Sequence, residues 1–316
     1  MKYHGIRRDR RNGAAAAVLA GAVTLFISSS VFAVRTEAVA GGRVDAFQNE
    51  IAEEAPFYYP VNCPDITVAA DGGPLEAEKF EPSEKREIKS VMRDGTEYYL
   101  LADALEISFG ETAKEGNADG ACFFVGEVAV GVDPSCFYAF SNGRYFAAEG
   151  NAVMCDGDFY VTAELLKTLI GVTVTEEGAL DTADAAFPRD GSEYYDGDSV
   201  TWLSRIISAE SRGESVMGKV AVGNVVLNRV RTPGYPNTIY GVIFDFEHGI
   251  QFTPAANGTV YNDPDGESVV AAKLCLEGVT VSEEILYFLN PSTADNHWVV
   301  NNRTYVTTIG SHEFYS

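Results

Sequence analysis

The sequence predicts an α+β protein in which a small domain with an internal repeat, residues 86–183, precedes a mainly helical domain, residues 199–316. Two observations favour this class. The first region repeats a turn–strand–helix–glycine unit, and the second carries apolar residues at helical spacing before it ends in short strands. With 316 residues, the chain is long enough for two domains that each bury a core.

The first 40 residues have the pattern of an export signal. A basic leader is followed by 22 uncharged residues, Gly13 to Val34, and small residues at Ala33 and Ala40 suit a signal peptidase. A retained membrane anchor is the alternative, because 22 such residues can span a bilayer. Either reading places the rest of the chain outside the cytoplasm, secreted or associated with the cell wall or spore.

The net charge of −23 restricts the partners of this protein. The first 40 residues carry a net charge of +4, so the remainder carries −27. Such an acidic surface repels nucleic acid and anionic lipid headgroups, so we expect neither nucleic acid nor a membrane as partner, apart from an uncleaved N-terminal anchor. A monomer is expected.

Residues 41–85 are acidic and show little periodicity, which predicts a largely flexible tether with one short strand at residues 66–70. Another polar stretch rich in Gly and Asp, residues 184–198, is predicted to link the two domains.

The region 86–183 contains two related segments that begin at Asp94 and Asp156. Each reads as an Asp-Gly turn, a strand, an amphipathic helix and a glycine stop, with alternating strand-like segments between them. The pattern resembles the copper amine oxidase N-terminal-like domain, which implies a binding or anchoring module. Residues 86–180 contain no histidine, so no copper site is expected; a structural spacer is the alternative.

The region 199–316 predicts helices over residues 199–213, ended by Gly213, and over 214–230, where the sequence is apolar on nearly all sides. Thr238 is expected to cap a short helix. Asn257-Gly258 predicts a hairpin turn, residues 263–278 a further helix, and the last segments strands.

Five cysteines, four of them in the N-terminal half, make one or two disulfides plausible in an exported chain. Cys275 is expected in the core. Histidines are few and far apart and no CxxC pair occurs, so neither a metal nor another cofactor is expected.

Glu210 falls in the last turn of the first predicted helix of the second domain. The partial negative charge of a helix C-terminus favours a protonated carboxyl. If Trp202, Phe252 or Tyr287 shields the carboxyl from water, the protonated form is favoured further. A general acid needs this property. A solvated turn, with Glu210 and Glu214 flanking a glycine, is the alternative.

Residues 203–315 resemble the SleB-type cell wall hydrolases, the spore-cortex-lytic enzyme family. The matching stretches are AESRGE (209–214), GKVAVGNVVLNRV (218–230), YPNTIYGVIF (235–244), QFTP (251–254), LYFLNP (286–291) and IGSHEFY (309–315). The resemblance implies a lysozyme-like fold of lytic transglycosylase type, cleavage of peptidoglycan between muramic acid and glucosamine, and Glu210 as the catalytic acid. The segment 245–250 is longer than the usual family loop, which affects the expected substrate range.

A hydrolytic glycosidase normally needs a second carboxylate. The candidates are Glu214, Asp245, Glu247, Asp263 and Asp265. Glu214 is interpreted mainly as a structural residue that accepts hydrogen bonds from backbone N–H groups. The resemblance implies instead a lytic transglycosylase, in which Glu210 alone donates and then accepts a proton and the 6-hydroxyl of the sugar attacks the anomeric carbon.

The remaining candidates would hold the substrate. Gln251 and Thr253 are expected to bond sugar substituents, and Phe252 and Tyr287 to stack on sugar rings unless they belong to the core. Asn290 is functional only if its side chain points into the groove, and His312 is interpreted as structural more readily than as catalytic.

Three other functions stay open from the sequence. They are an inactive wall-binding protein that keeps the fold, a hydrolytic muramidase, and an amidase or peptidase that uses Cys275 with a distant histidine.

Overall fold

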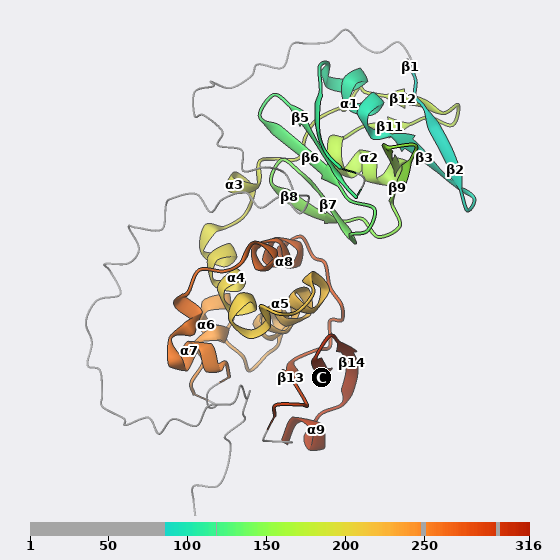
Figure 1. The fold of residues 1–316 in the computed structure, drawn as a ribbon. Coiled ribbons are helices and arrows are strands. Elements are labelled where there is room, and N and C mark those ends of the chain that lie inside the picture. Colours follow the sequence, from blue (N-terminus) through green and yellow to red (C-terminus); the bar gives the residue numbers. More distant parts are fainter. Residues whose placement is uncertain (1–85, 118, 248–250, 295–297) are drawn as a thin grey trace, which may run out of the picture.

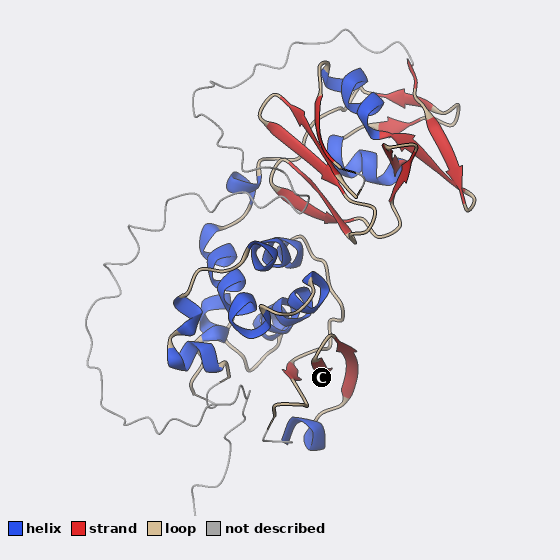
Figure 2. Ribbon diagram, in the orientation of Figure 1, coloured by secondary structure: helices blue, strands red, loops and turns tan. Residues whose placement is uncertain are grey.

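The computed structural model describes residues 86–316 except 118, 248–250 and 295–297. The predicted export signal, the tether, the strand at 66–70 and Cys63 therefore lie outside the described residues. Helices and strands are mixed as predicted, with most strands in the N-terminal region and most helices in the C-terminal region (Figures 1 and 2). Within the described residues, no helix is both long and apolar enough to cross a membrane.

In the part of the N-terminal region that the structure describes, the strands form three antiparallel sheets, which are accompanied by two helices. A five-stranded sheet has the order β4-β5-β6-β7-β8, a four-stranded sheet β2-β3-β10-β9, and a three-stranded sheet β1-β12-β11. The strands are β1 Arg86–Glu87, β2 Ser90–Arg93, β3 Thr96–Leu100, β4 Ala113–Gly116, β5 Ala121–Val125, β6 Val128–Val132, β7 Tyr138–Ser141, β8 Arg144–Ala147, β9 Ala152–Cys155, β10 Asp158–Thr162, β11 Thr173–Val174 and β12 Ala179–Asp181.

Two Asp-Gly turns shape the four-stranded sheet. Asp94-Gly95 joins β2 to β3 and Asp156-Gly157 joins β9 to β10, and all four residues have positive φ, as a two-residue hairpin turn requires. The strand after each turn leads into a helix, α1 Leu101–Phe109 or α2 Ala163–Ile170, and each helix is followed by a glycine with positive φ. The relation of this region to the copper amine oxidase N-terminal-like domain stays a prediction.

The two faces of the five-stranded sheet serve different cores. Phe123 and Val130 pack with α1 and α2 in a core that belongs to the N-terminal region alone. Tyr138, Phe140 and Tyr145 belong instead to a core shared with the C-terminal helices. The segment predicted as a linker contains α3 Gly191–Tyr194, and Gly191 N–H donates to the carbonyl of Asn142 at 2.8 Å.

Helices form the core of the C-terminal region. They are α4 Gly197–Ser211, α5 Val216–Arg231, α6 Ile239–Ile243, α7 Thr253–Asn257, α8 Gly266–Leu276 and α9 Trp298–Asn302, with a 3-10 turn η1 at Thr259–Tyr261. Side-chain caps begin α4 at Asp196, α5 at Ser215, α6 at Thr238 and α8 at Asp265. As predicted, α5 is central: all twelve residues from Gly218 to Arg229 are buried.

The C-terminal strands form an antiparallel sheet of order β13-β15-β14, with β13 at Tyr287–Leu289, β14 at Tyr305–Ile309 and β15 at His312–Tyr315. In Figure 1 this sheet lies beside the helices, away from the N-terminal sheets. The sheet supplies one wall of the site described below.

Three local predictions are wrong. Residues 251–261 form α7 and η1 instead of a hairpin, because Pro254 stands in the first turn of α7 and Gly258 caps the end of that helix with φ of 84°. The helix α4 ends at Ser211, before Gly213, which lacks a positive φ. The four described cysteines, Cys122, Cys136, Cys155 and Cys275, are free thiols, so the structure shows no disulfide among them.

The two regions are joined by polar as well as apolar contacts. Arg144 in β8 makes two hydrogen bonds of 2.6 Å to the carboxylate of Glu277, the C-cap residue of α8. Tyr195 Oη donates to the same carboxylate at 2.7 Å, and Lys273 Nζ donates to the carbonyl of Gly143 at 3.2 Å. Both side chains of the Arg144–Glu277 pair are largely shielded from water, so the N-terminal region is fixed on α8.

Candidate active site

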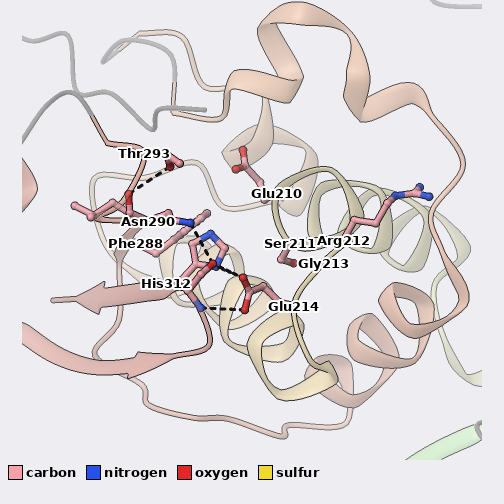
Figure 3. A pocket seen from close by; sticks show the side chains of 11 residues that line it. Glu210, Ser211, Arg212, Gly213, Glu214, Phe288, Asn290, Thr293 and His312 are labelled. Carbon is pink, nitrogen blue, oxygen red and sulfur yellow. Dashed lines mark hydrogen bonds and ion pairs between the residues drawn. The ribbon is translucent and has the colours of Figure 1, made fainter. Parts of the chain in front are cut away.

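A cavity of about 230 Å³ opens where the end of α4 meets the C-terminal sheet (Figure 3). One wall is the stretch Glu210–Glu214, and the opposite wall comes from β13, the loop after it and the start of β15. The residues of that second wall are Phe288, Leu289, Asn290, Thr293, Ser311 and His312. The site thus joins segments that are about 80–100 residues apart in the sequence.

Glu210 lies in the last turn of α4, and its carboxyl group faces the cavity in Figure 3. The residue is partly exposed, yet its Oε1 atom is inaccessible to water and has no hydrogen-bond partner within the described part of the chain. Ile206 and Ile207 on the same helix are fully buried, so α4 is anchored while its end remains open to the cavity. The carboxyl is therefore shielded on one side and accessible on the other.

Burial raises the pKa of Glu210 to about 7, and the positive charge of Arg229 opposes that shift. Because a carboxyl with this pKa is about half protonated at neutral pH, it can give a proton and, after losing it, take one back. The predicted property of Glu210 thus follows mainly from loss of contact with water.

Glu214 lies in the same cavity but has different surroundings. Its carboxylate accepts hydrogen bonds from Ser311 Oγ and from Ser311 N–H, the latter at 3.2 Å. Partial burial raises the pKa of this carboxyl, but the Ser311 hydrogen bonds and the neighbouring His312 outweigh it, so the net pKa is lowered. These contacts fit the interpretation of Glu214 as an ionised residue that holds the loop.

His312 is buried at the base of the cavity. Its Nδ1 atom is 3.7 Å from Glu214 Oε1 and has no hydrogen-bond partner within the described residues. Burial lowers the pKa of His312, against the influence of Glu214, so the imidazole is neutral at pH 7. The ring packs edge-on against Phe288 at 5.3 Å between centroids.

Asn290 lines the cavity and donates from Nδ2 to Ser311 Oγ at 3.2 Å. Its Oδ1 accepts from Ser292 N–H at 3.0 Å, which holds the turn after β13. The side chain therefore reaches the cavity wall, as its candidate role required, and also supports Ser311, the partner of Glu214.

A polar network holds the end of α4 from the side away from the cavity. Lys219, 1% exposed, donates to Asp265 at 3.0 Å and to Glu267 at 2.6 Å. Asp265 also accepts from Ser208 Oγ at 3.1 Å, two residues before Glu210. Arg212 Nη2 donates to Ser208 Oγ and to the carbonyl of Asp263, and Figure 3 shows the Arg212 side chain turned away from Glu210.

Four candidate substrate contacts do not line this cavity: Gln251, Phe252, Thr253 and Tyr287. Phe252 is 0% exposed, so stacking of its ring on a sugar is contradicted by its position in the core. Tyr287 is 9% exposed; its hydroxyl bonds Tyr235 and Arg303, and its ring lies against two arginines. Gln251 is buried as well.

The sequence reasoning did not select Ser311, Thr293 or Arg229. Ser311 stands beside a selected residue, His312, but its role depends on the approach of Glu214 from another element. Arg229 could have been singled out from the sequence, because it is a charged residue in a helix predicted to be buried on nearly all sides. Cys275 is 1% exposed and burial strongly raises its pKa, so it cannot serve as the thiolate nucleophile of an amidase or peptidase.

No group of three or more His, Cys, Asp and Glu side chains suited to hold a metal ion occurs among the residues that the structure describes. The arrangement at Glu210 needs none for proton transfer. A half-shielded carboxyl in an open cavity has the properties that a general acid–base catalyst needs.

Most of the C-terminal region is similar to known proteins. Residues 213–315 match the family model described as cell wall hydrolase. The spore cortex-lytic enzyme of Bacillus subtilis (strain 168) is 35% identical over 120 residues, which cover 38% of this chain and 38% of that protein. The enzyme of the same name from Bacillus cereus is also 35% identical over 120 residues, covering 45% of its length. Residues 213–315 are therefore similar to the cell wall hydrolases, in a match that begins three residues after Glu210.

Two solved structures match the same region. The catalytic domain of the germination-specific lytic transglycosylase SleB from Bacillus anthracis is 34% identical, with 39% of this chain and 97% of that chain covered and a TM-score of 0.36. The catalytic domain of the Bacillus cereus SleB protein gives 34% identity and a TM-score of 0.35. The chain spans less than half the length of the curated relatives it matches.

Proposed function

We propose that this protein cleaves the glycan strands of peptidoglycan between muramic acid and glucosamine as a lytic transglycosylase, with Glu210 as the single acid and base. The observation that carries the proposal is the half-shielded Glu210 carboxyl, whose pKa is raised to about 7, in a cavity open to substrate. The relatives named as cortex-lytic enzymes and lytic transglycosylases support the substrate class.

In the first step, the protonated Glu210 donates its proton to the glycosidic oxygen, and the bond from this oxygen to the anomeric carbon breaks. In the second step, the ionised Glu210 accepts the proton of the 6-hydroxyl of the same muramic acid residue. The 6-oxygen then bonds the anomeric carbon, which yields a 1,6-anhydro end without addition of water.

The surroundings of Glu214 favour this mechanism over a hydrolytic one. A hydrolytic muramidase needs a second carboxylate that is free to attack or to activate water. Glu214 shares the cavity, but both of its oxygens accept hydrogen bonds from Ser311. Glu214 instead ties the loop after α4 to the turn between β14 and β15.

A catalytic assay tests the proposal directly. Glu210→Gln should abolish release of muropeptides from purified peptidoglycan, because the amide can neither donate nor accept the proton, while Glu283→Gln on the exposed surface should retain full activity. Mass spectrometry should find anhydro-muramic ends in the wild-type products. Reducing ends would indicate hydrolysis, and activity retained by Glu210→Gln would exclude this residue as the acid.

We further propose that the protein acts outside the cytoplasm, where peptidoglycan is located, and that glycan strands of spore cortex or vegetative wall are its partners. A turbidity assay on both wall types separates these substrates. Binding to walls without clearing of either suspension would favour an inactive wall-binding protein.

A further inference from the structure

Four aromatic side chains meet on the surface of the C-terminal helices, and we call them the aromatic patch. Trp202 belongs to α4, Tyr240 to α6, Phe244 is the residue that ends α6, and Tyr261 belongs to η1. Trp202 and Phe244 are partly buried against the core, whereas Tyr240 is 47% and Tyr261 55% exposed. Exposed groups of large apolar side chains commonly mark binding surfaces.

The rings of the patch brace one another. The ring centre of Trp202 lies 5.1 Å from that of Tyr240, 5.4 Å from that of Phe244 and 5.8 Å from that of Tyr261, with the Trp202 plane steeply inclined to all three. Phe244 lies 4.5 Å from Tyr240 and 6.1 Å from Tyr261, at interplanar angles of 34° and 35°. Such contacts are favourable, so the two exposed tyrosines are held in place before any ligand arrives.

Arg205 adds a cation to the patch. Its guanidinium carbon lies 5.6 Å from the ring centre of Trp202. Partial burial raises the pKa of the Tyr261 hydroxyl, Tyr240 adds to this rise, and the charge of Arg205 opposes it. The Nε atom of Arg205 is shielded from water and has no hydrogen-bond partner among the residues that the structure describes. Because an unpaired shielded donor is unfavourable, an acceptor oxygen brought by a ligand would be stabilised beside these rings.

The patch and the cavity share one helix. Trp202, Arg205 and Ala209 are spaced three and four residues apart, so they lie on one face of α4. Ala209 is exposed and directly precedes Glu210. At 1.5 Å per residue, Trp202 lies about 12 Å along the helix axis from Glu210. None of the four aromatic residues lines the cavity itself, and α6 lies beside α4 in Figure 1.

The chemistry of the patch suits a sugar chain. A pyranose ring has a face of C–H groups that can pack on an aromatic ring, and oxygen atoms at its edge that can accept hydrogen bonds. Exposed tyrosine rings offer the first contact and Arg205 the second. An anionic membrane is a poor alternative, because the net charge of the chain is −23.

We propose that the aromatic patch, together with Arg205, is a second binding surface for the glycan strands of peptidoglycan, separate from the cavity but on the helix that carries Glu210. The choice of ligand rests on the proposed function. Contacts made at this surface act on the binding of a long strand and do not touch the bond that is cleaved.

The fluorescence of Trp202 tests binding directly. In the full chain carrying Glu210→Gln and Trp298→Phe, Trp202 is the remaining tryptophan and the proposed acid is absent. Soluble glycan strands freed of their peptides are the ligand, and they should shift the emission of Trp202.

Substitutions of the exposed tyrosines in this background test the patch. The double variant Tyr240→Ala/Tyr261→Ala should bind about tenfold more weakly, because two stacking contacts are lost. Tyr240→Phe/Tyr261→Phe keeps both rings and should retain most of the affinity. Tyr305→Ala is the matched control and should bind as the parent does, because Tyr305 is 53% exposed but lies outside the patch, in β14.

Activity supplies a second readout in chains that keep Glu210. The double alanine variant should have a raised KM on purified peptidoglycan and a kcat near the wild-type value, since the patch holds the strand equally before and during the reaction. The anhydro ends of the products should be unchanged.

Unchanged glycan affinity in the folded double alanine variant would overturn the proposal, even if the wild type is active. Loss of a dimer in this variant with unchanged glycan affinity would also overturn it and would assign the patch to contact between copies. If the double variant does not fold, Tyr240→Ala and Tyr261→Ala are tested singly by the same criterion. An inactive wild type that still binds glycan through the two tyrosines would refute the proposed function and leave the binding surface supported.

Discussion

At the scale of single residues, Glu210 holds a carboxyl where its charge is unfavourable. Its Oε1 atom is dry, and burial raises the pKa of the group to about 7 from the ordinary 4.5. The same property that prepares the residue for proton transfer must therefore cost folding stability when the carboxyl ionises.

The sign of this effect follows from proton binding. Between pH 4.5 and about 7 the folded protein holds a proton on Glu210 more tightly than the unfolded chain does. The contribution of Glu210 to stability thus falls as pH rises through this window and stays constant above it. The total loss is at most about 3 kcal/mol.

We therefore expect Glu210→Gln to be more stable than the wild type at pH 8 and about equal to it at pH 4.5, because the amide cannot ionise. Urea unfolding at a series of pH values measures the difference, with Glu283→Gln as an exposed control that should follow the wild type. A difference that does not change with pH would contradict the shifted pKa.

At the scale of elements, one side chain connects the loop between α4 and α5 to the turn between β14 and β15. Glu214 reaches Ser311 from the first loop, and Gly310 leaves room for its carboxylate. A Cβ atom at Gly310 would overlap Glu214 Oε2, and the φ of 59° at this glycine already disfavours other residues. The two walls of the cavity depend on this contact.

Glu214→Ala should lower the free energy of unfolding by about 1–3 kcal/mol, because it removes the acceptor of two hydrogen bonds that involve a charged group. It should reduce the rate of muropeptide release but leave the anhydro ends of the products unchanged. Gly310→Ala should have a similar effect.

Denaturant unfolding and product analysis together check this prediction. Ser292→Ala, on the exposed loop after β13, is the matched control and should resemble the wild type in both assays. A switch from anhydro to reducing ends in Glu214→Ala would show that Glu214 takes part in the chemistry, against the role assigned here.

At the scale of the whole molecule, the N-terminal region and the C-terminal helices are packed as one unit. Phe140 and Tyr145 of the five-stranded sheet share a core with α8. The ion pair between Arg144 and Glu277 adds a polar contact between the same sheet and the end of α8. Glu277 ends α8, and Asp265, which supports the end of α4 through Ser208, begins it. The N-terminal region is thus attached to a helix that also supports the site.

Arg144→Ala should destabilise the protein by about 2–4 kcal/mol, because it leaves the shielded Glu277 carboxylate without its charged partner. It should also weaken the coupling of the two regions. Hydrogen exchange reports on both regions, and fluorescence reports on the C-terminal region alone, because both tryptophans, Trp202 and Trp298, lie there.

In the wild type, the two signals should change at the same urea concentration, and in Arg144→Ala they should separate. Arg93→Ala, at an exposed position in β2, is the control and should preserve a single transition. Unchanged stability together with coincident transitions in Arg144→Ala would show that the regions are held by the apolar core alone.

The sequence by itself predicted most of the helices and strands and the cap at Thr238, and its resemblance to the cell wall hydrolases selected Glu210. The helices and the cap depend on local spacing and on residue types: Thr238 caps α6, and the apolar pattern buries α5. The prediction at Asn257-Gly258 was wrong because glycine is common both in hairpin turns and at the ends of helices. Here Gly258 ends the helix α7.

The tertiary structure alone decided which side chains surround Glu210. Phe288 comes from β13 and Ser311 from the turn between β14 and β15. Phe252 and Tyr287, which the sequence suggested as substrate contacts, lie against Arg229 instead. The sequence shows that a residue is aromatic, but it does not show whether the ring contacts a sugar or a buried cation. That contact depends on packing between segments that are distant in the sequence. The pKa of Glu210 depends on the same packing, because loss of water and the nearness of a charge are properties of the folded chain.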